Sequence, residues 1–264
     1  MIATFSPVRA QDNLEYFGDG EYMMFDNNFN KTEGSFNGNG PSRLLIVSVD
    51  EDAETATLEW ELVLEDHTPI YGDNDRLPTG NLLASSWPAT INANASFQYD
   101  VRIFETVRAT KQPAWEAFVL GQGCQHPDDG SGGCVRSTGA IPTGWSMYSV
   151  ERFYDAPLVW NISCDAARSA ATTVSFTAHN VFKQNGPRPG TFKFFSAGDN
   201  GEHNTALLEG WFNFSAYWRE TQVSVDISAF ASDEGRWDGM LSVTNEWGDR
   251  TAKAVSCGGG DGDR

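Results

Sequence analysis

The sequence predicts an all-β protein, with two propeller-blade-like four-stranded meanders (a partial β-propeller) followed by an immunoglobulin-like β-sandwich. Three observations predict this class. One β unit occurs twice in the first half of the chain, a Gly-, Pro-, Ser- and Asp-rich stretch follows, and short apolar segments then recur about every ten residues between turn signals. We therefore divide the chain into a partial propeller at 1–120, a linker loop at 121–147, a sandwich at 148–257 and a flexible tail at 258–264.

The repeated unit is clearest in the stretches Asp12–Asp26 and Thr68–Trp87. With the two turn glycines superposed, the aligned pairs are Gly20 and Gly80, Glu21 and Asn81, Phe17 and Leu77, and Asn13 and Asp73. Both copies continue into an amphipathic strand pair that ends in Trp-Glu, at 60–61 and at 115–116. Recurring four-stranded meanders are typical of propeller blades. A plain antiparallel sheet with coincidental similarity is the alternative.

Period-2 alternation and turn residues place the strands of the first half. The first meander is expected at residues 14–26 around the Gly18-Asp19-Gly20 turn, at Arg43–Val49 and at Ala56–Leu64, and the second at Asp75–Leu77, Asn81–Ser86, Ser96–Phe104 and Ala114–Leu120. Two blades cannot close a ring, which needs about four or more. We expect the remaining blades upstream of Met1; alternatively, the two sheets pack on each other.

Seven short strands are expected in the second half, separated by turns such as Asn185-Gly186-Pro187. They are Leu158–Cys164, Thr173–His179, Thr191–Phe195, Leu207–Trp218, Gln222–Ile227, Met240–Asn245 and Ala252–Cys257. Trp211 and Trp218 are seven residues apart, so on one strand they would point to opposite faces. At least one of them is therefore expected to be exposed, which leaves sugar or protein binding open.

Net charge and cysteine content limit the possible binding partners and the cellular compartment of the protein. The net charge of −18 and the pI near 4.4 argue against a nucleic-acid or anionic-membrane surface, and no apolar run is long enough to span a membrane. The four cysteines predict two disulfides, Cys124 with Cys134 and Cys164 with Cys257, with free thiols as the alternative. Glycosylation sequons begin at Asn30, Asn94, Asn161 and Asn213. Together these features indicate an extracellular or secretory-pathway protein, expected to be a fragment or a trimmed chain and anchored by a segment outside this sequence.

Five pieces of sequence at 12–120 resemble the eukaryotic branch of the arylsulfotransferase-like family. They are NLEYFGDGEYMMFDN at 13–27, SRLLI at 42–46, ATLEWE at 56–61, YGD at 71–73 and RLPTGN at 76–81. The resemblance implies a β-propeller with a site at its axis. Family enzymes transfer a sulfuryl group from a phenolic ester to a phenol through a sulfated histidine, without a nucleotide donor.

The resemblance also indicates where a site would lie. Family histidines lead the inner strand of a blade, but the matching positions here are Gln11-Asp12-Asn13 and Gly72-Asp73-Asn74. His67 is the nearest candidate nucleophile, and a solvent-facing histidine at a strand end is the alternative. Arg76 would contact the anion or pair with Asp73 or Asp75. We therefore assign catalysis to His67, Arg76 and Asp73, and ligand binding to Tyr71, Asp12 and Asn13.

Two functional hypotheses follow. The first is an arylsulfotransferase-like protein that is inactive as this chain, whose ligand would be a small phenolic or sulfated molecule. The alternative is a non-catalytic extracellular binding or adhesion module that uses the sandwich to contact a protein or glycan. No cofactor or metal site is expected. Acidic turns account for the Asp/Gly clusters, which lack the spacing of an EF-hand loop, with Ca²⁺ as the other explanation.

Overall fold

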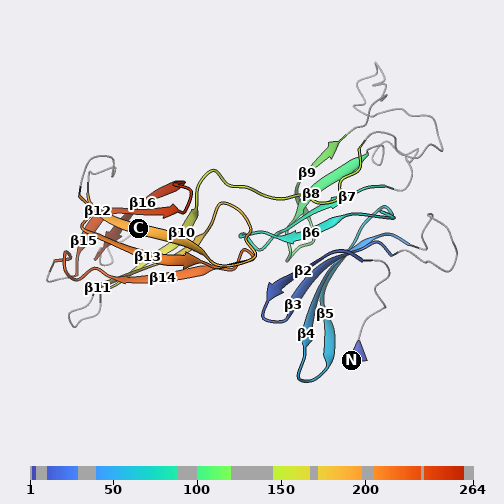
Figure 1. The fold of residues 1–264 in the computed structure, drawn as a ribbon, viewed down its shortest axis with the longest axis horizontal. Helices are drawn as coiled ribbons and strands as arrows, with labels where there is room; N and C mark the ends of the chain where they lie inside the picture. Colours follow the sequence, from blue (N-terminus) through green and yellow to red (C-terminus); the bar gives the residue numbers. More distant parts are fainter. Residues whose placement is uncertain are drawn as a thin grey trace, which may run out of the picture. The chain divides into compact units, whose positions relative to one another are not determined.

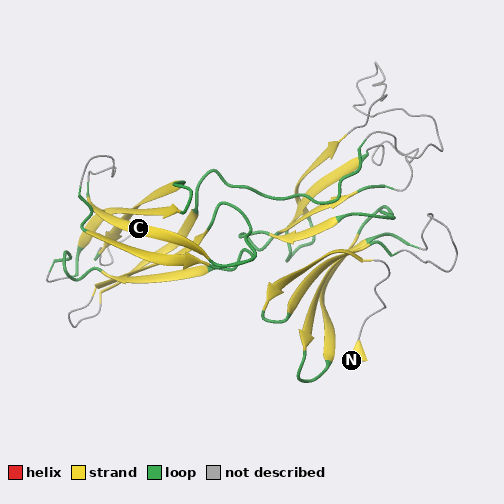
Figure 2. Cartoon of the chain, in the orientation of Figure 1, coloured by secondary structure: helices red, strands yellow, loops and turns green. Residues whose placement is uncertain are grey.

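A computed structural model describes residues 2–3, 11–28, 40–88, 100–119, 145–166, 172–197, 205–232 and 235–258. The chain forms two compact units, Met1–Arg152 and Phe153–Arg264. The described residues of both units form β-strands joined by turns and loops (Figure 2), which confirms the predicted all-β class. Within this part of the chain, no helix is long and apolar enough to cross a membrane.

The first unit opens with an antiparallel meander. Its strands are β2 (Gln11–Gly18), β3 (Glu21–Asp26), β4 (Arg43–Asp50) and β5 (Thr55–Val63), and the short β1 (Ile2–Ala3) pairs in parallel with β5. Along the sheet the order is β1-β5-β4-β3-β2 (Figure 1). Gly20 turns β2 into β3 at φ 77°, where a Cβ atom would lie 2.5 Å from the Val49 carbonyl oxygen.

A second meander follows the same plan. Its strands are β6 (Asp73–Arg76), β7 (Leu82–Ser86), β8 (Val101–Thr106) and β9 (Pro113–Val119), in that order across the sheet. Gly80 occupies the turn between β6 and β7 at φ 82°, as Gly20 does in the first copy. The predicted strand Ser96–Phe104 begins later in the structure, at Val101, and its first residues up to position 99 lie outside the described ranges.

The strand registers of the two meanders correspond. The matched rows of cross-strand partners are Glu15–Met23–Ile46–Trp60 in the first sheet and Asp75–Leu83–Glu105–Trp115 in the second. Both rows end at the tryptophan of a Trp-Glu pair, as the sequence repeat requires. The two meanders are therefore structural copies of one blade-like unit.

Polar contacts join the two sheets of the first unit. Asn74 Nδ2 donates hydrogen bonds to the backbone oxygens of Met24 and Leu45, at 3.3 Å and 3.2 Å. Gly72, at φ 111°, lies so close to Phe25 that a Cβ atom would be 2.6 Å from its ring. Because Gly72 leads directly into β6, this close approach sets how the second meander begins against β3.

The second unit is a two-sheet sandwich of immunoglobulin-like type. Its strands are β10 (Leu158–Ala166), β11 (Thr172–His179), β12 (Arg188–Ser196), β13 (Leu208–Phe214), β14 (Thr221–Asp226), β15 (Trp237–Asn245) and β16 (Arg250–Cys257). The sheets have the orders β10-β11-β14 and β13-β12-β15-β16. All of the strands predicted for this half are present, with shifted ends.

Aromatic side chains fill the space between these two sheets. Phe176 is fully buried, and its ring centroid lies 6.4 Å from that of Phe192 and 6.2 Å from that of Phe212. The predicted disulfide Cys164–Cys257 is present and joins the first strand of the sandwich to the last. Cys124 and Cys134 lie outside the described residues.

Within the sandwich, the predicted end of β13 differs most from the structure. The strand expected at Leu207–Trp218 stops at Phe214. Tyr217 and Trp218 have φ values of 55° and 59°, which belong to the left-handed region rather than to an extended strand. Trp218 is buried whereas Trp211 is 80% exposed, which confirms the expectation of one exposed tryptophan. The reason differs from the predicted one, because Trp218 lies beyond the end of β13 rather than on the opposite face of the same strand.

Candidate functional site

Two regions of the molecule gather functional side chains, and the first lies in the first unit where the resemblance predicts a site. Asn13 on β2 donates a hydrogen bond to the carboxylate of Asp73 on β6. The other oxygen of Asp73 accepts a hydrogen bond from the Val150 backbone at 2.6 Å. Asn13 and Asp73 occupy aligned positions of the repeat. The structure brings these two predicted site residues into contact. The backbone near Val150 joins them from much later in the chain.

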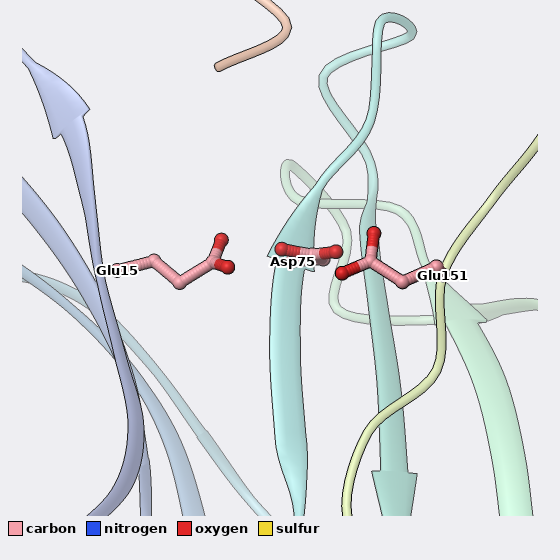
Figure 3. A group of neighbouring side chains, drawn as sticks. All are labelled: Glu15, Asp75 and Glu151. Atoms are coloured by element: carbon pink, nitrogen blue, oxygen red, sulfur yellow. The ribbon is translucent and has the colours of Figure 1, made fainter. Parts of the chain in front are cut away.

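Three carboxylates gather beside this contact. Glu15 on β2, Asp75 on β6 and Glu151 point toward one another (Figure 3), and one oxygen of each lies within 4.8 Å of the others. Asp75 is fully buried and Glu151 is exposed. Hard cations such as Ca²⁺ prefer oxygen ligands of this kind, but a Ca²⁺ site takes about six to eight of them. The cluster also gives this end of β6 a negative charge, which opposes binding of a sulfate ester.

Arg76 and His67, the remaining predicted catalytic residues, face other neighbours. Arg76 Nη1 lies 3.6 Å from Glu21 Oε1, and its guanidinium carbon lies 4.1 Å from the centroid of the Phe17 ring. His67 lies in the loop between β5 and β6, with both ring nitrogens buried, which corrects the alternative of a solvent-facing histidine. Burial lowers the pKa of His67, against opposing effects of the Gly40 backbone and of Asp66.

The predicted ligand-binding residues Tyr71 and Asp12 have structural contacts. The Tyr71 carbonyl accepts a hydrogen bond from Asn27 Nδ2 at 2.7 Å, and its ring meets that of Tyr148 edge-on at 5.6 Å between centroids. Asp12 lies on β2 opposite Phe25. Neither contact identifies a ligand.

Two of the predicted glycosylation sites lie on described strands of the sandwich. Asn161 is exposed at an irregularity in the pairing of β10 with β11, and Asn213 is exposed on β13. Asn213 and Trp211 alternate with inward-facing residues and share the outer face of the strand. Asn30 and Asn94 lie outside the described residues.

The second region is an open groove on the outer face of the four-stranded sheet of the sandwich. Its volume is about 750 Å³, within the range of small-ligand sites. One row of cross-strand neighbours crosses the sheet from edge to edge. In order from β13 to β16 it contains Trp211, Thr191, Thr244 and Arg250.

The next row of the groove adds charge and a hydroxyl group. Lys193 Nζ lies 3.0 Å from Glu209 Oε2, and both side chains are exposed. Arg250 Nε donates a hydrogen bond of 2.7 Å to Ser242 Oγ, which holds the guanidinium over the sheet. Among the described residues, the groove therefore combines an exposed indole, hydroxyl groups and the charged side chains Lys193, Glu209 and Arg250. We call this set of residues the sandwich groove.

Sequence reasoning missed both clusters as sites. The repeat alignment could have indicated Glu15 with Asp75, because the offset that superposes Asn13 on Asp73 also superposes these two acids. Nothing in the sequence places Glu151 beside them. The alternation along β13 did indicate an exposed tryptophan, but the row that Trp211 forms with Arg250 requires the pairing of four strands.

No protein-family model matches the chain, and no curated protein matches it. Among solved structures, the chain is similar to a DUF3823 family protein from Bacteroides ovatus, with 11% identity and a TM-score of 0.28 over 83% of this chain and 88% of that chain. A likeness this distant carries no argument about function.

Proposed function

We propose that the protein is a non-catalytic extracellular binding module whose sandwich groove binds a glycan. One observation carries this proposal: Trp211 is 80% exposed at one end of a row that includes Thr191 and Thr244, above a groove of about 750 Å³. An indole this exposed leaves apolar surface in water, and a ligand that covers it gains hydrophobic stabilisation.

Glycans suit the groove because their rings have two kinds of surface. A pyranose ring presents C–H bonds on one face, which pack on an indole, and hydroxyl groups at its edge, which exchange hydrogen bonds with Thr191 and Thr244. Trp211 and Arg250 are separated by three interstrand steps, or about 14 Å. That span accommodates a short oligosaccharide rather than a single sugar.

The setting outside the cell is part of this proposal. The disulfide Cys164–Cys257 supports it, because such bonds persist in oxidising compartments. The exposed sequon asparagines Asn161 and Asn213 also support it. An extracellular protein would meet glycans of cell walls, matrices or neighbouring surfaces.

The test is binding of the purified chain to an oligosaccharide array, followed by calorimetry on the glycans that bind. We expect Trp211→Ala to weaken binding at least tenfold, which corresponds to about 1.4 kcal/mol. The matched control is Trp247→Ala, since Trp247 is 48% exposed in the same unit and stacks on Phe182 rather than lining the groove. Absence of glycan binding, or equal effects of the two substitutions, would contradict the proposal.

A second candidate function, sulfuryl transfer, is favoured by one specific observation. Burial lowers the pKa of His67, which keeps the imidazole neutral and therefore nucleophilic near pH 7. The acidic cluster of Glu15, Asp75 and Glu151 opposes this function by repelling a sulfate ester. We expect no transfer from a chromogenic aryl sulfate to a phenol; measurable transfer that His67→Ala abolishes would establish catalysis instead.

A further inference from the structure

We infer that an N-linked glycan on Asn213 packs on Trp211 and covers that end of the sandwich groove. The inference starts from a spacing on β13. Asn213 opens the sequon Asn213-Phe214-Ser215, and Trp211 precedes it by two residues. The contact between the attached glycan and Trp211 stands by itself, whereas its effect on other glycans rests on the proposed function.

The two side chains lie on the same face of β13. Residues two apart on a strand share a face and are about 7 Å apart along the chain. Trp211 and Asn213 are both exposed, whereas Phe212 between them faces the core, with its ring centroid 6.2 Å from that of Phe176. A sugar bonded to the Asn213 side chain therefore begins beside the indole, on the outer face of the sheet.

The modification joins Asn213 Nδ2 to the anomeric carbon of an N-acetylglucosamine residue. The amide nitrogen loses one proton as this bond forms. The bond between the same carbon and a lipid-linked diphosphate donor breaks, and the diphosphate leaves with the bonding electron pair. The product is a neutral amide that carries a bulky sugar chain.

The exposed indole favours contact with this sugar chain. Trp211 is 80% exposed, and a pyranose ring that covers one face of the indole removes apolar surface from water. A tethered ligand meets its site at an effective concentration on the order of millimolar. Contact with an affinity too weak for a free sugar is therefore sufficient to keep the attached glycan on Trp211.

The sequon at Asn161 provides an internal comparison. Asn161 is exposed on β10 of the same unit, at an irregularity in the strand pairing. Val159, two residues before it, is 6% exposed, so this sequon offers no exposed ring at the corresponding position. We expect the glycan of Asn213, and not that of Asn161, to cover Trp211.

The contact regulates the groove because Trp211 ends the row that includes Thr191 and Thr244. An oligosaccharide from outside the molecule must displace the attached glycan before it stacks on the indole. Glycosylated protein should therefore bind external glycans more weakly than protein that lacks this modification. Occupancy of Asn213 sets how much of the protein is open to an external ligand.

The test uses the full chain secreted from a eukaryotic host, unaltered and as Asn213→Gln and Asn161→Gln. Mass spectrometry of glycopeptides measures occupancy, and hydroxyl-radical footprinting measures oxidation of Trp211, with the 48% exposed Trp247 as reference. Oxidation of Trp211 in the unaltered protein should be lower by at least about half than in Asn213→Gln, because a sugar covers one of the two faces of the indole. Asn161→Gln should match the unaltered protein.

Three results would overturn the inference: an Asn213 that is secreted unmodified, equal oxidation of Trp211 with and without its glycan, or loss of protection in Asn161→Gln. Calorimetry then uses the array oligosaccharide that binds Asn213→Gln most tightly. We expect the unaltered protein to bind it at least about fivefold more weakly. Equal affinities would overturn the competition.

The two proposals fail in different ways. An external oligosaccharide that binds a chain whose Trp211 is never protected would overturn the inference and leave the proposed function standing. Protection of Trp211 by the attached glycan, with no external oligosaccharide bound by any form, would overturn the proposed function and leave the contact standing.

Discussion

The two units bury apolar cores, but they differ in the charged groups that they bury beside them. Among the described residues, the buried carboxylates all belong to the first unit; they are Asp26, Asp73, Asp75, Asp100 and Glu105. The sandwich instead buries phenylalanine and tryptophan, with rings of Phe176, Phe194 and Trp237 in edge-on contacts. The first unit therefore adds buried carboxylates and their polar contacts to its apolar core, whereas the second combines apolar packing with a disulfide.

Buried charge in the first unit requires matched partners, because a carboxylate taken out of water is costly when it is unpaired. Asp26 is bonded to Arg43, whose guanidinium also contacts Glu61 at 2.8 Å. Glu105 accepts hydrogen bonds from Asn81, Trp115 and Arg152. Such contacts specify the strand register within each meander, because a shift of one residue would leave these groups without partners.

In the sandwich, apolar packing leaves the outer face of the sheets to exposed side chains. The core of the sandwich is formed by side chains that point inward from its two sheets. Trp211 lies on the outer face and is not part of that core, so it remains exposed. In the first unit the conspicuous polar side chains belong to the packing of two sheets. Trp211 is thus exposed on the sandwich, whereas the buried carboxylates of the first unit belong to its packing.

The largest effect that tests this comparison is loss of the disulfide. Replacing Cys164 and Cys257 together by serine should destabilise the second unit by about 2–5 kcal/mol, because the bond closes a long loop. Amide hydrogen exchange, followed peptide by peptide, should show faster exchange in β11 and β15. Protection in β4 and β8 should remain unchanged.

A uniform loss of protection across β4, β8, β11 and β15 would contradict the separate stability of the two units. Thiol reduction of the unaltered protein provides a second way to break the Cys164–Cys257 bond. It should reproduce the result of the double substitution. Unchanged exchange in β11 and β15 after reduction would show that the sandwich does not depend on its disulfide.

Much of the fold follows from the sequence because the signals for strands and for turns are both local in the chain. Alternating apolar residues placed the strands, and turn glycines such as Gly20 and Gly80 aligned the two meanders. The end of β13 could not be predicted, because Trp218 is apolar and continues the strand pattern while its φ of 59° ends it. The preference of a residue for strands does not predict a backbone conformation that contacts with distant parts of the chain impose.

The candidate sites are less predictable than the fold because they depend on pairing across elements. Asp75 reaches Glu15 only after the second meander has packed on the first, and Glu151 joins them from a loop that follows β9. Trp211 and Arg250 share a row only through the registers of four strands. A one-residue slip in any register would separate them.

A smaller effect tests how closely the two meanders approach each other. Gly72→Ala and Gly80→Ala both place a side chain at positive φ, at a cost of about 1–2 kcal/mol each. Only Gly72→Ala forces a Cβ atom to within 2.6 Å of the Phe25 ring, whereas nothing lies within 4 Å of the Cβ position at Gly80. We expect Gly72→Ala to cost about 1–3 kcal/mol more in urea unfolding of the first unit. Equal costs would show that β6 does not depend on this contact.

The smallest expected effect is the contribution of Glu105 to the pH dependence of the first unit's stability. Burial raises the pKa of Glu105, but hydrogen bonds from Asn81 and Trp115, with the charge of Arg152, outweigh it and hold the pKa below its ordinary value of 4.5. A depressed folded-state pKa means that this stabilisation is complete above the unfolded-state pKa. It is lost as the pH falls through the folded-state pKa.

Comparison of the unaltered protein with Glu105→Gln isolates that contribution from the many other carboxylates. The variant should be less stable at pH 7, and its deficit should shrink as the pH falls below about 4.5. Glu116→Gln is the control, because Glu116 lies on the neighbouring strand and pairs with Arg102 in a more exposed setting. Hydrogen exchange in β8 is the measurement. A deficit that stays constant with pH would mean that Glu105 stabilises the second meander through its shape rather than its charge, and the polar account of the first unit would then fail at its best-connected residue.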